Sequence, residues 1–316
     1  MTAPTGVLLM TFGSAQTAEE VPDYLRSVRG GGDPDPAVVT EFQRRYELVG
    51  WSPLVRITLE QGQALQRVLD ETHGAGRYAV AVGMLHSDPR IDDALRALAG
   101  AGAERVIGIV LSPQYSPIIM GGYNRAITAA AARELPAAEV RVAGPWHTAT
   151  SFVDELAGRV RQALERFPEP ERVPIIFTAH SLPKAVVDRD TGYIDQLVET
   201  IELVAERAGL ARERWQFAYQ SAGHTPEEWL KPDLKDLLPG LHDEGYGDVL
   251  VVPVQFLADH LEILYDIDVA AREEAEEAGL RFHRIDLPNT SPVFIRALAE
   301  VVEREDRAVS ATGGRT

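Results

Sequence analysis

The chain has 316 residues, 45% hydrophobic and 25% charged, which is a globular composition large enough for two packed lobes. Its formal net charge of −17 argues against nucleic acid as a partner, because the phosphate backbone would be repelled. The absence of cysteine excludes disulfides, thiolate zinc sites and a cysteine-ligated iron–sulfur cluster. No apolar run approaches the ~20 residues of a membrane span, and no signal-peptide pattern opens the chain, so a cytoplasmic protein without stable membrane association is expected.

Continuous apolar runs alternate with helical patterns from one end of the chain to the other. This alternation predicts βαβ units with buried parallel strands, and therefore a doubly wound α/β fold. Pro253 interrupts the last apolar run, which predicts an edge strand or a bulge near its end. Strands are expected at 6–12, 78–85, 105–111, 173–179, 215–220 and 248–256. Helices are expected at 19–28, 36–48, 54–72, 90–100, 123–134, 151–166, 193–208, 259–277 and 292–304.

The two halves of the chain resemble each other. Residues 9–14 resemble 176–181, and the stretch that begins at His86 resembles the one that begins at His224. Such a duplication predicts two similar α/β lobes with a cleft between their facing strand ends. The expected segments are a first lobe at 1–148, a second lobe at 149–289, a helix at 290–308 that packs back on the lobes, and a flexible tail at 309–316.

Polar groups follow two of the apolar runs, where open α/β sheets carry their sites. His180 ends one run, while Asp259, Glu262 and Asp266 follow another at a spacing that places them on one helix face. A histidine that faces carboxylates can bind a divalent metal and accept protons. The alternative is a hydrogen-bonded core histidine and acids that favour a helix N-terminus. His260 is expected on the opposite side of this helix from Glu262, and therefore outside the metal set.

An arginine-rich stretch and an apolar loop could contact a ligand. The arginines could bind an anionic substrate, but acids are interspersed among them, and charge pattern alone favours solvated helix charges. The loop at 111–125 carries Ile118, Ile119 and Met120, which either cover a flat apolar ligand or pack on the core. The arginines are Arg26, Arg29, Arg44, Arg45 and Arg56, and the acids are Asp33, Asp35, Glu41 and Glu47.

Several segments, in the same order, resemble the ferrochelatases. The segments are 8–14, 46–54, 178–183, 220–226 and 254–266. The lack of a long C-terminal extension and of a membrane-inserting lip resembles the soluble bacterial branch, which inserts Fe²⁺ into coproporphyrin III in haem biosynthesis. The resemblance implies a lyase with two Rossmann-like lobes that hold the macrocycle between them. Coproporphyrin III and Fe²⁺ are the implied substrates, without a further cofactor. A monomer is expected, with a downstream haem-pathway enzyme as a candidate partner.

The resemblance also implies roles for individual residues. It assigns the metal-binding and proton-accepting pair to His180 and Glu262, and Asp266 would extend an acidic path to solvent. Many members of this branch carry tyrosine at the position of Phe12, and a phenyl ring can stack on the macrocycle but cannot ligate iron. Some actinobacterial relatives hold a cysteine-ligated iron–sulfur cluster, which this chain cannot. The implied porphyrin contacts are Phe12, Arg29, Arg45, Tyr46, Ser52 and Tyr123.

Three alternatives stay open from the sequence. The chain could metallate protoporphyrin IX, or it could be another tetrapyrrole chelatase, such as one acting on sirohydrochlorin. It could also be a two-lobed haem or metal binding protein. Such a binding protein is usually exported and needs no base facing a carboxylate, so we favour an enzyme.

Overall fold

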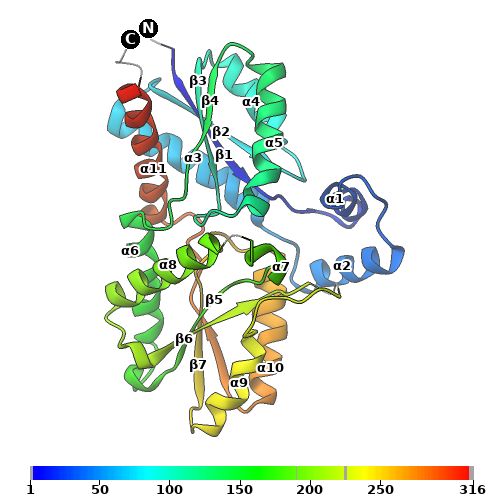
Figure 1. The fold of residues 1–316 in the computed structure, drawn as a ribbon, viewed down its shortest axis with the longest axis vertical. Coiled ribbons are helices and arrows are strands. Elements are labelled where there is room, and N and C mark those ends of the chain that lie inside the picture. Colours follow the sequence, from blue (N-terminus) through cyan, green and yellow to red (C-terminus); the bar gives the residue numbers. More distant parts are fainter. Residues whose placement is uncertain (1–2, 190, 224–225, 313–316) are drawn as a thin grey trace. The chain divides into compact units, whose positions relative to one another are not determined.

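The computed structural model describes residues 3–189, 191–223 and 226–312 (Figure 1). Contacts within the chain divide it into two compact units. Unit 1 comprises Met1–Ser151 together with Asn289–Thr316, and unit 2 comprises Phe152–Pro288. The last helix, α11 (Pro292–Thr312), therefore belongs to unit 1. It continues past residue 308, where the sequence analysis ends it, and residues 313–316 of the expected tail lie outside the described part.

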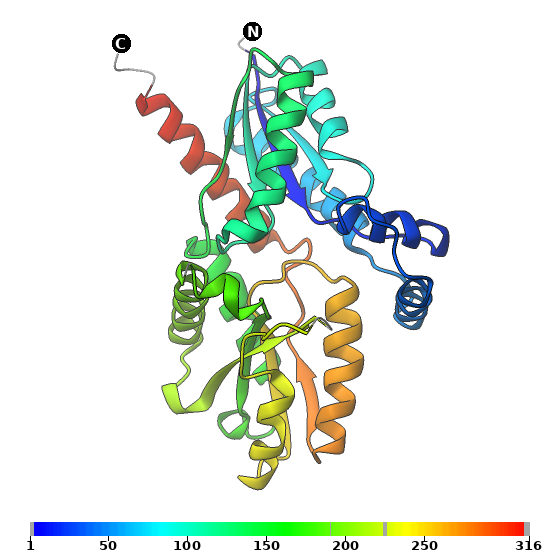
Figure 2. The same ribbon diagram turned by 45° about the vertical axis from the view of Figure 1, so that its right-hand side comes forward.

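Unit 1 is built on a parallel sheet in the order β2-β1-β3-β4. Helices α3 and α11 pack on one face of this sheet, and α4 and α5 pack on the other. Figure 2 shows α1 and α2 standing away from the sheet. The strands are β1 (Thr5–Thr11), β2 (Tyr78–Met84), β3 (Arg105–Val110) and β4 (Glu139–Val142). The helices before α11 are α1 (Val21–Val28), α2 (Pro36–Leu48), α3 (Leu54–His73), α4 (Ile91–Gly100) and α5 (Pro117–Glu134), with a 3₁₀ turn at Ala18–Glu20.

Unit 2 repeats this plan with a parallel sheet in the order β6-β5-β7-β8. Helices α9 and α10 pack on one face, and α6 and α8 contact each other through an Arg161–Arg207 hydrogen bond of 2.7 Å. The strands are β5 (Ile175–His180), β6 (Trp215–Gln220), β7 (Asp248–Pro253) and β8 (Arg281–Arg284). The helices are α6 (Thr150–Leu164), α7 (Lys184–Val187), α8 (Gly192–Ala208), α9 (Leu234–Asp243), a π-helix (Glu262–Ala271) and α10 (Arg272–Glu277), with 3₁₀ turns at Pro170–Arg172 and Arg212–Arg214.

The sheets confirm the predicted α/β class, and three details differ from the sequence expectation. The short strands β4 and β8 were not expected, because each lies at a sheet edge and needs no continuous apolar run. Of the two alternatives for Pro253, the edge position is wrong, since β7 pairs with both β5 and β8, and a bulge near the strand end stays a prediction. Pairing between β7 and β8 ends at Val251. Pro253 lies beyond it, where β8 requires no backbone N–H from β7, so the missing N–H of proline breaks no hydrogen bond to β8.

The apolar loop of the sequence analysis is mostly helix and core. Helix α5 begins at Pro117, and Met120 and Tyr123 are buried in the hydrophobic core of unit 1. Ile119 packs partly buried against the same core, whereas the side chain of Ile118 lies outside the described part. The packing interpretation therefore holds for Met120 and Ile119, because helix α5 turns both toward the core beside β3.

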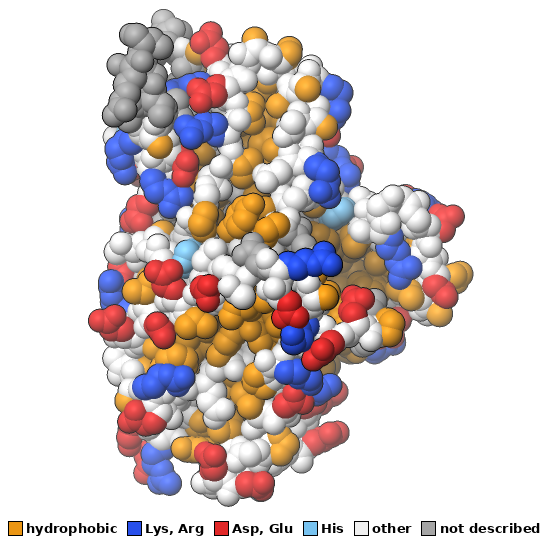
Figure 3. Space-filling model, in the orientation of Figure 1, with side chains coloured by type: hydrophobic (Ala, Val, Ile, Leu, Met, Phe, Trp, Pro, Cys, Tyr) orange, Lys and Arg blue, Asp and Glu red, His pale blue; other side chains and the backbone are white. Residues whose placement is uncertain are grey.

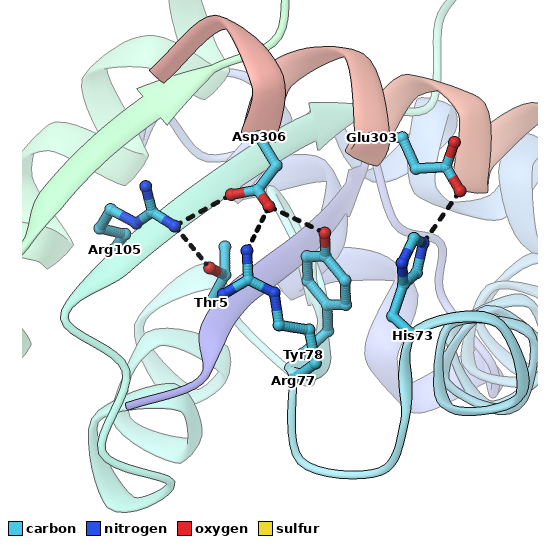
Figure 4. Close-up of polar contacts among 7 residues, drawn as sticks. All are labelled: Thr5, His73, Arg77, Tyr78, Arg105, Glu303 and Asp306. Atoms are coloured by element: carbon cyan, nitrogen blue, oxygen red, sulfur yellow. Dashed lines mark hydrogen bonds and ion pairs between the residues drawn. The ribbon is translucent and has the colours of Figure 1, made fainter. Parts of the chain in front are cut away.

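Asp306 ties the C-terminal helix to the sheet of unit 1 (Figure 4). The buried carboxylate accepts hydrogen bonds from Arg77 Nη2 at 2.7 Å, Tyr78 Oη at 2.9 Å and Arg105 Nη2 at 3.0 Å. Burial, reinforced by the bond to Asp306, raises the pKa of Tyr78 to about 12. One carboxylate on α11 thus satisfies groups at the start of β2 and β3, which explains why residues far apart in sequence form one unit.

Replacing Asp306 with alanine is expected to lower the free energy of unfolding by about 2 kcal/mol, because the buried Tyr78 hydroxyl loses its acceptor and two partly exposed arginines, Arg77 and Arg105, lose their carboxylate partner. The matched control is Glu303→Ala on the same helix. It loses the partly exposed pair with His73 at 2.9 Å and the exposed pair with Arg307 at 3.8 Å, and it should cost less than about 1 kcal/mol. Urea unfolding measures both. Equal losses for the two variants would show that Asp306 is not a special anchor.

Candidate active site

His180 and Glu262 face each other within unit 2. His180 is the last residue of β5, and its Nε2 lies 3.5 Å from Oε2 of Glu262, the first residue of the π-helix. Their side chains are 28% and 42% exposed, so ligands can reach both. The structure thus brings together the two residues that the sequence analysis paired, because β5 and β7 are neighbours and their polar residues follow the same sheet edge.

Hydrogen bonds orient the His180 ring and leave one nitrogen available. Ring Nδ1 contacts the carbonyl of Ser181, which can only accept a hydrogen bond, so Nδ1 carries the proton. In the neutral imidazole Nε2 then presents its lone pair on the Glu262 side. The backbone N–H of His180 donates to Oε1 of buried Gln255 at 3.0 Å, which holds the strand end in place. This arrangement suits a proton acceptor or a metal ligand.

His260 also contacts Glu262, which corrects the sequence expectation. Its Nε2 lies 3.7 Å from Glu262 Oε2, and its Nδ1 donates to the carbonyl of Ala258 at 2.9 Å. Sequence spacing predicted His260 and Glu262 on opposite sides of one helix. His260 instead precedes the π-helix, which begins at Glu262, so the angular spacing of helical residues does not separate the two side chains. The sequence carried no signal for this contact other than nearness along the chain.

Electrostatic interactions couple the side chains of His180, His260 and Glu262. Burial raises the pKa of Glu262, but a positive charge on His180, present when its ring is protonated, and the nearby His260 at 3.7 Å outweigh burial and lower this pKa to about 2. Burial lowers the pKa of His260, but Glu262 outweighs it, so the pKa of His260 lies above its ordinary value. Glu262 is therefore an anion at physiological pH, and its negative charge favours the protonated form of His260.

The acidic residues expected on one helix face at 259–266 are divided between the helix and the loop before it. A π-helix has i→i+5 bonding, so residues four apart lie nearly one full turn apart, and Glu262 and Asp266 stay on the same side of the helix. Asp259 precedes it and pairs with Arg284 at 3.4 Å, so its charge is compensated. Within the described ranges no group of three or more His, Asp or Glu residues is arranged to hold a metal ion. The pair at His180 and Glu262 is formed, and a role for Asp266 stays a prediction.

Phe12 and His86 form an aromatic pair in unit 1. Phe12 directly follows β1, is 41% exposed, and its ring centroid lies 4.4 Å from that of His86. Gly13, with a φ of +92°, turns the chain here, and a Cβ at that position would collide with Ser87. His86 Nδ1 lies 3.0 Å from Ser27 Oγ, and burial, followed by the charge of Arg90, lowers the pKa of His86 to about 4. A neutral imidazole thus packs against the exposed phenyl ring of Phe12. The sequence did not predict this contact.

The arginine-rich stretch divides into paired and unpaired side chains. Arg45 Nε lies 2.7 Å from Glu41, and Arg56 lies 2.8 Å from Glu60. Arg29 closes α1 and is exposed, and no residue in the described part of the chain pairs with it. Figure 3 shows acidic and basic side chains interspersed over the visible face rather than gathered into one basic patch. Salt bridges within helices thus explain most of this stretch, and Arg29 is the exception.

The remaining predicted contacts lie inside unit 1. Tyr46 is buried, stacks on Trp51 at 5.4 Å, and its hydroxyl lies 2.9 Å from Ser14 Oγ. Ser52 is buried, and its Oγ accepts from the N–H of Leu54 at 3.4 Å at the start of α3. Burial raises the pKa of Tyr123 above its ordinary value. These side chains shape the unit, and direct ligand contacts by them stay predictions.

The fold first defines a class of architecture, which is shared with solved structures of chelatases. The structure of SirB from Bacillus subtilis with Fe³⁺ aligns at a TM-score of 0.57 and 13% identity, covering 98% of both chains. DR2241 from Deinococcus radiodurans, described as structurally similar to chelatases, aligns at a TM-score of 0.56 and 14% identity over 95% of this chain and 55% of its own. At such identities the likeness concerns the fold alone, and it confirms the two α/β lobes.

Sequence comparison then identifies the family. A model of the ferrochelatase family matches residues 4–306. The ferrochelatase of Deinococcus radiodurans is 40% identical over 311 residues, covering 97% of this chain and 98% of its own. A coproporphyrin III ferrochelatase of Geobacillus sp. is 36% identical over 301 residues, covering 94% of this chain and 96% of its own. The chain belongs to the ferrochelatase family, which confirms the resemblance. None of the helices described is long and apolar enough to cross a membrane.

Proposed function

We propose that this protein inserts Fe²⁺ into coproporphyrin III as a step of haem biosynthesis. Family membership and relatives named coproporphyrin III ferrochelatase support the reaction and the substrate. The observation that carries the mechanism is the 3.5 Å pairing of an oriented imidazole with a carboxylate held as an anion. A binding protein would have no need of a base placed against a carboxylate.

The reaction requires a proton acceptor, because both pyrrole N–H protons leave as the metal enters the ring. We assign this role to Nε2 of His180, whose lone pair is free when Nδ1 is bonded to the Ser181 carbonyl. The imidazolium formed by the first proton transfer lies beside the Glu262 anion, which stabilises it. Proton transfer of this kind contributes about 10²–10⁴ in rate.

Glu262 would attract and hold Fe²⁺ as substrate. The alternative role, uptake of the second proton, is disfavoured by a pKa lowered to about 2. Mixed imidazole and carboxylate ligands suit Fe²⁺. His260 faces the same carboxylate oxygen, Oε2, that faces His180. Asp266, one turn further along the π-helix, is our candidate for relaying protons toward solvent.

Unit 1 would contact the macrocycle through an exposed ring and a cation. Phe12 offers a phenyl face, and neutral His86 behind it adds no charge. Arg29 is available for a propionate, whereas Arg45 must share its charge with Glu41. We therefore expect Arg29 to contribute more than Arg45 to the binding of a tetrapropionate porphyrin. Tyr46, Ser52 and Tyr123 would act by shaping the surface around these groups.

Arg29→Gln is expected to weaken coproporphyrin III binding by about tenfold, the loss of one charge-assisted pair. It should weaken protoporphyrin IX binding less, because that ring carries fewer propionates. Fluorescence quenching titrations measure both affinities. Arg56→Gln, which removes an exposed cation paired with Glu60, is the control and should change neither. Equal losses for the two porphyrins would mean that Arg29 does not read the additional propionates.

Phe12→Tyr is expected to place a phenol within reach of the iron of the product. An oxygen ligand should change the visible spectrum of the bound ferric product and slow its release. The measurement is the spectrum and the release rate after a single turnover, compared with the unchanged protein. A variant that stays active with an unaltered product spectrum would show that residue 12 does not lie over the metal.

The experiment that tests the proposed function is metallation under anaerobic conditions, followed by absorption. Fe²⁺ is supplied with coproporphyrin III, with protoporphyrin IX, or with sirohydrochlorin, and Co²⁺ replaces Fe²⁺ in parallel. The highest kcat/KM is expected for Fe²⁺ with coproporphyrin III. Faster metallation of another tetrapyrrole would overturn the substrate assignment. Tight porphyrin binding without metallation would instead indicate a binding protein.

A further inference from the structure

Unit 2 contains a pocket of about 220 Å³ that the proposed metallation chemistry does not use. Its polar wall is formed by Arg166, Arg272, His283 and Arg284, and its apolar wall includes Phe167 and Phe282. Among the described residues, no acidic side chain lines it. A pocket with cationic and aromatic walls is unusual in a chain whose net charge is −17, and it indicates a local site for an anion.

Arg272 is the centre of this pocket, because it is held in place and still has donors to offer. Its Nε donates to the carbonyl of Asp268 and its Nη1 to the carbonyl of Phe282, both at 3.1 Å. The guanidinium carbon lies 5.1 Å from the centre of the Phe282 ring. No carboxylate in the described part of the chain pairs with it. A preorganised arginine with unused N–H groups suits bidentate binding of an oxyanion.

The other cations have partners and act through their charge. Arg284 is bound by Asp268 at 2.7 Å, and Arg166, at an exposed position, lies 3.4 Å from Asp286. His283 Nε2 lies 2.9 Å from Asp248, and its ring contacts Phe167 edge-on with centroids 4.6 Å apart. The carboxylates offset the charges of Arg166 and Arg284. Arg272 therefore supplies the direct contact and the uncompensated guanidinium charge of this pocket, and the two phenyl rings form a wall.

We propose that this pocket binds a phosphate group, either free or as part of a small phosphate ester. The guanidinium fork of Arg272 matches a phosphate edge, and Arg166 can reach the same anion when it leaves Asp286. The pocket volume equals that of roughly seven water molecules at about 30 Å³ each, which leaves room for a substituent beside the phenyl walls. None of these residues takes part in the proposed metallation, so the two proposals are independent.

The test is a titration of the whole protein, without iron or porphyrin, at constant ionic strength. Inorganic phosphate and phenyl phosphate are the probes, and calorimetry together with amide chemical shifts gives the affinity and the location. Saturable binding at one site is expected, with the shifts centred on β8 and the start of α10. Tighter binding of phenyl phosphate would assign the site to an ester, and equal binding would assign it to free phosphate.

Matched variants decide whether Arg272 is responsible. Arg272→Gln should weaken binding by about tenfold or more, as expected for one lost charge-assisted contact. Arg272→Lys, which keeps the charge but loses the fork, should fall between Arg272→Gln and the unchanged protein. The control is Arg281→Gln on the same strand, a 73% exposed cation that pairs with Asp248 and should change binding less than twofold. Absence of saturable binding, or equal losses in Arg272→Gln and Arg281→Gln, would overturn the proposal.

Discussion

Replacing His180 with alanine is expected to lower the metallation rate by about 10²–10⁴-fold, because the reaction loses its proton acceptor. Porphyrin affinity should change little, since the imidazole acts on pyrrole protons rather than on the propionates. Glu262 stays ionised, as its carboxylate keeps its contact with His260. Single-turnover metallation with Fe²⁺ and coproporphyrin III gives the rate, and fluorescence quenching gives the affinity.

The matched control for this variant is His242→Ala, which removes an exposed histidine of α9 in the same unit. It should leave the rate unchanged. A second readout is rescue, because added imidazole can occupy the space left in His180→Ala and restore part of the rate. Near-normal turnover of His180→Ala would remove this residue from the mechanism.

The second large effect is expected for Glu262→Gln. The amide keeps the shape of the side chain but removes the negative charge that attracts Fe²⁺ and stabilises an imidazolium at His180. We expect a rate loss of about 10²-fold or more and a higher KM for Fe²⁺ with an unchanged KM for porphyrin. An effect confined to the porphyrin KM would contradict the metal-attracting role.

Titration of His260 offers a test of Glu262→Gln that does not depend on activity. The pKa of His260 is raised by Glu262, so it should fall in the variant, as measured by NMR of the ring protons. Folding lowers the pKa of Glu262 to about 2, so the ionised carboxylate stabilises the folded state at pH values above the pKa of the unfolded chain. This stabilisation is lost as the pH falls toward 2. Unfolding of Glu262→Gln should therefore depend less on pH below about pH 4.5. An unchanged His260 titration would show that the two side chains are not coupled.

Local pattern was sufficient for the fold class and for the central pair of the site. Buried parallel strands must be apolar on both faces, so β1, β3, β5 and β7 are readable as continuous runs. His180 and Glu262 each follow such a run. Because parallel strands end at one edge of a sheet, their position along the chain already predicted their proximity in space.

Tertiary structure decided the features that depend on contacts between distant segments. The edge strands β4 and β8 are partly exposed, so their sequences contain no continuous apolar run from which they could be predicted. Asp259 and His260 lie in the loop before the π-helix. There His260 contacts Glu262 and Asp259 pairs with Arg284, and α-helical spacing predicts neither contact. The burial of Tyr46 and Tyr123 and the anchoring of α11 through Asp306 likewise come from packing. Sequence periodicity encodes which face of an element is apolar, whereas the partner of each polar side chain is set only when the elements pack together.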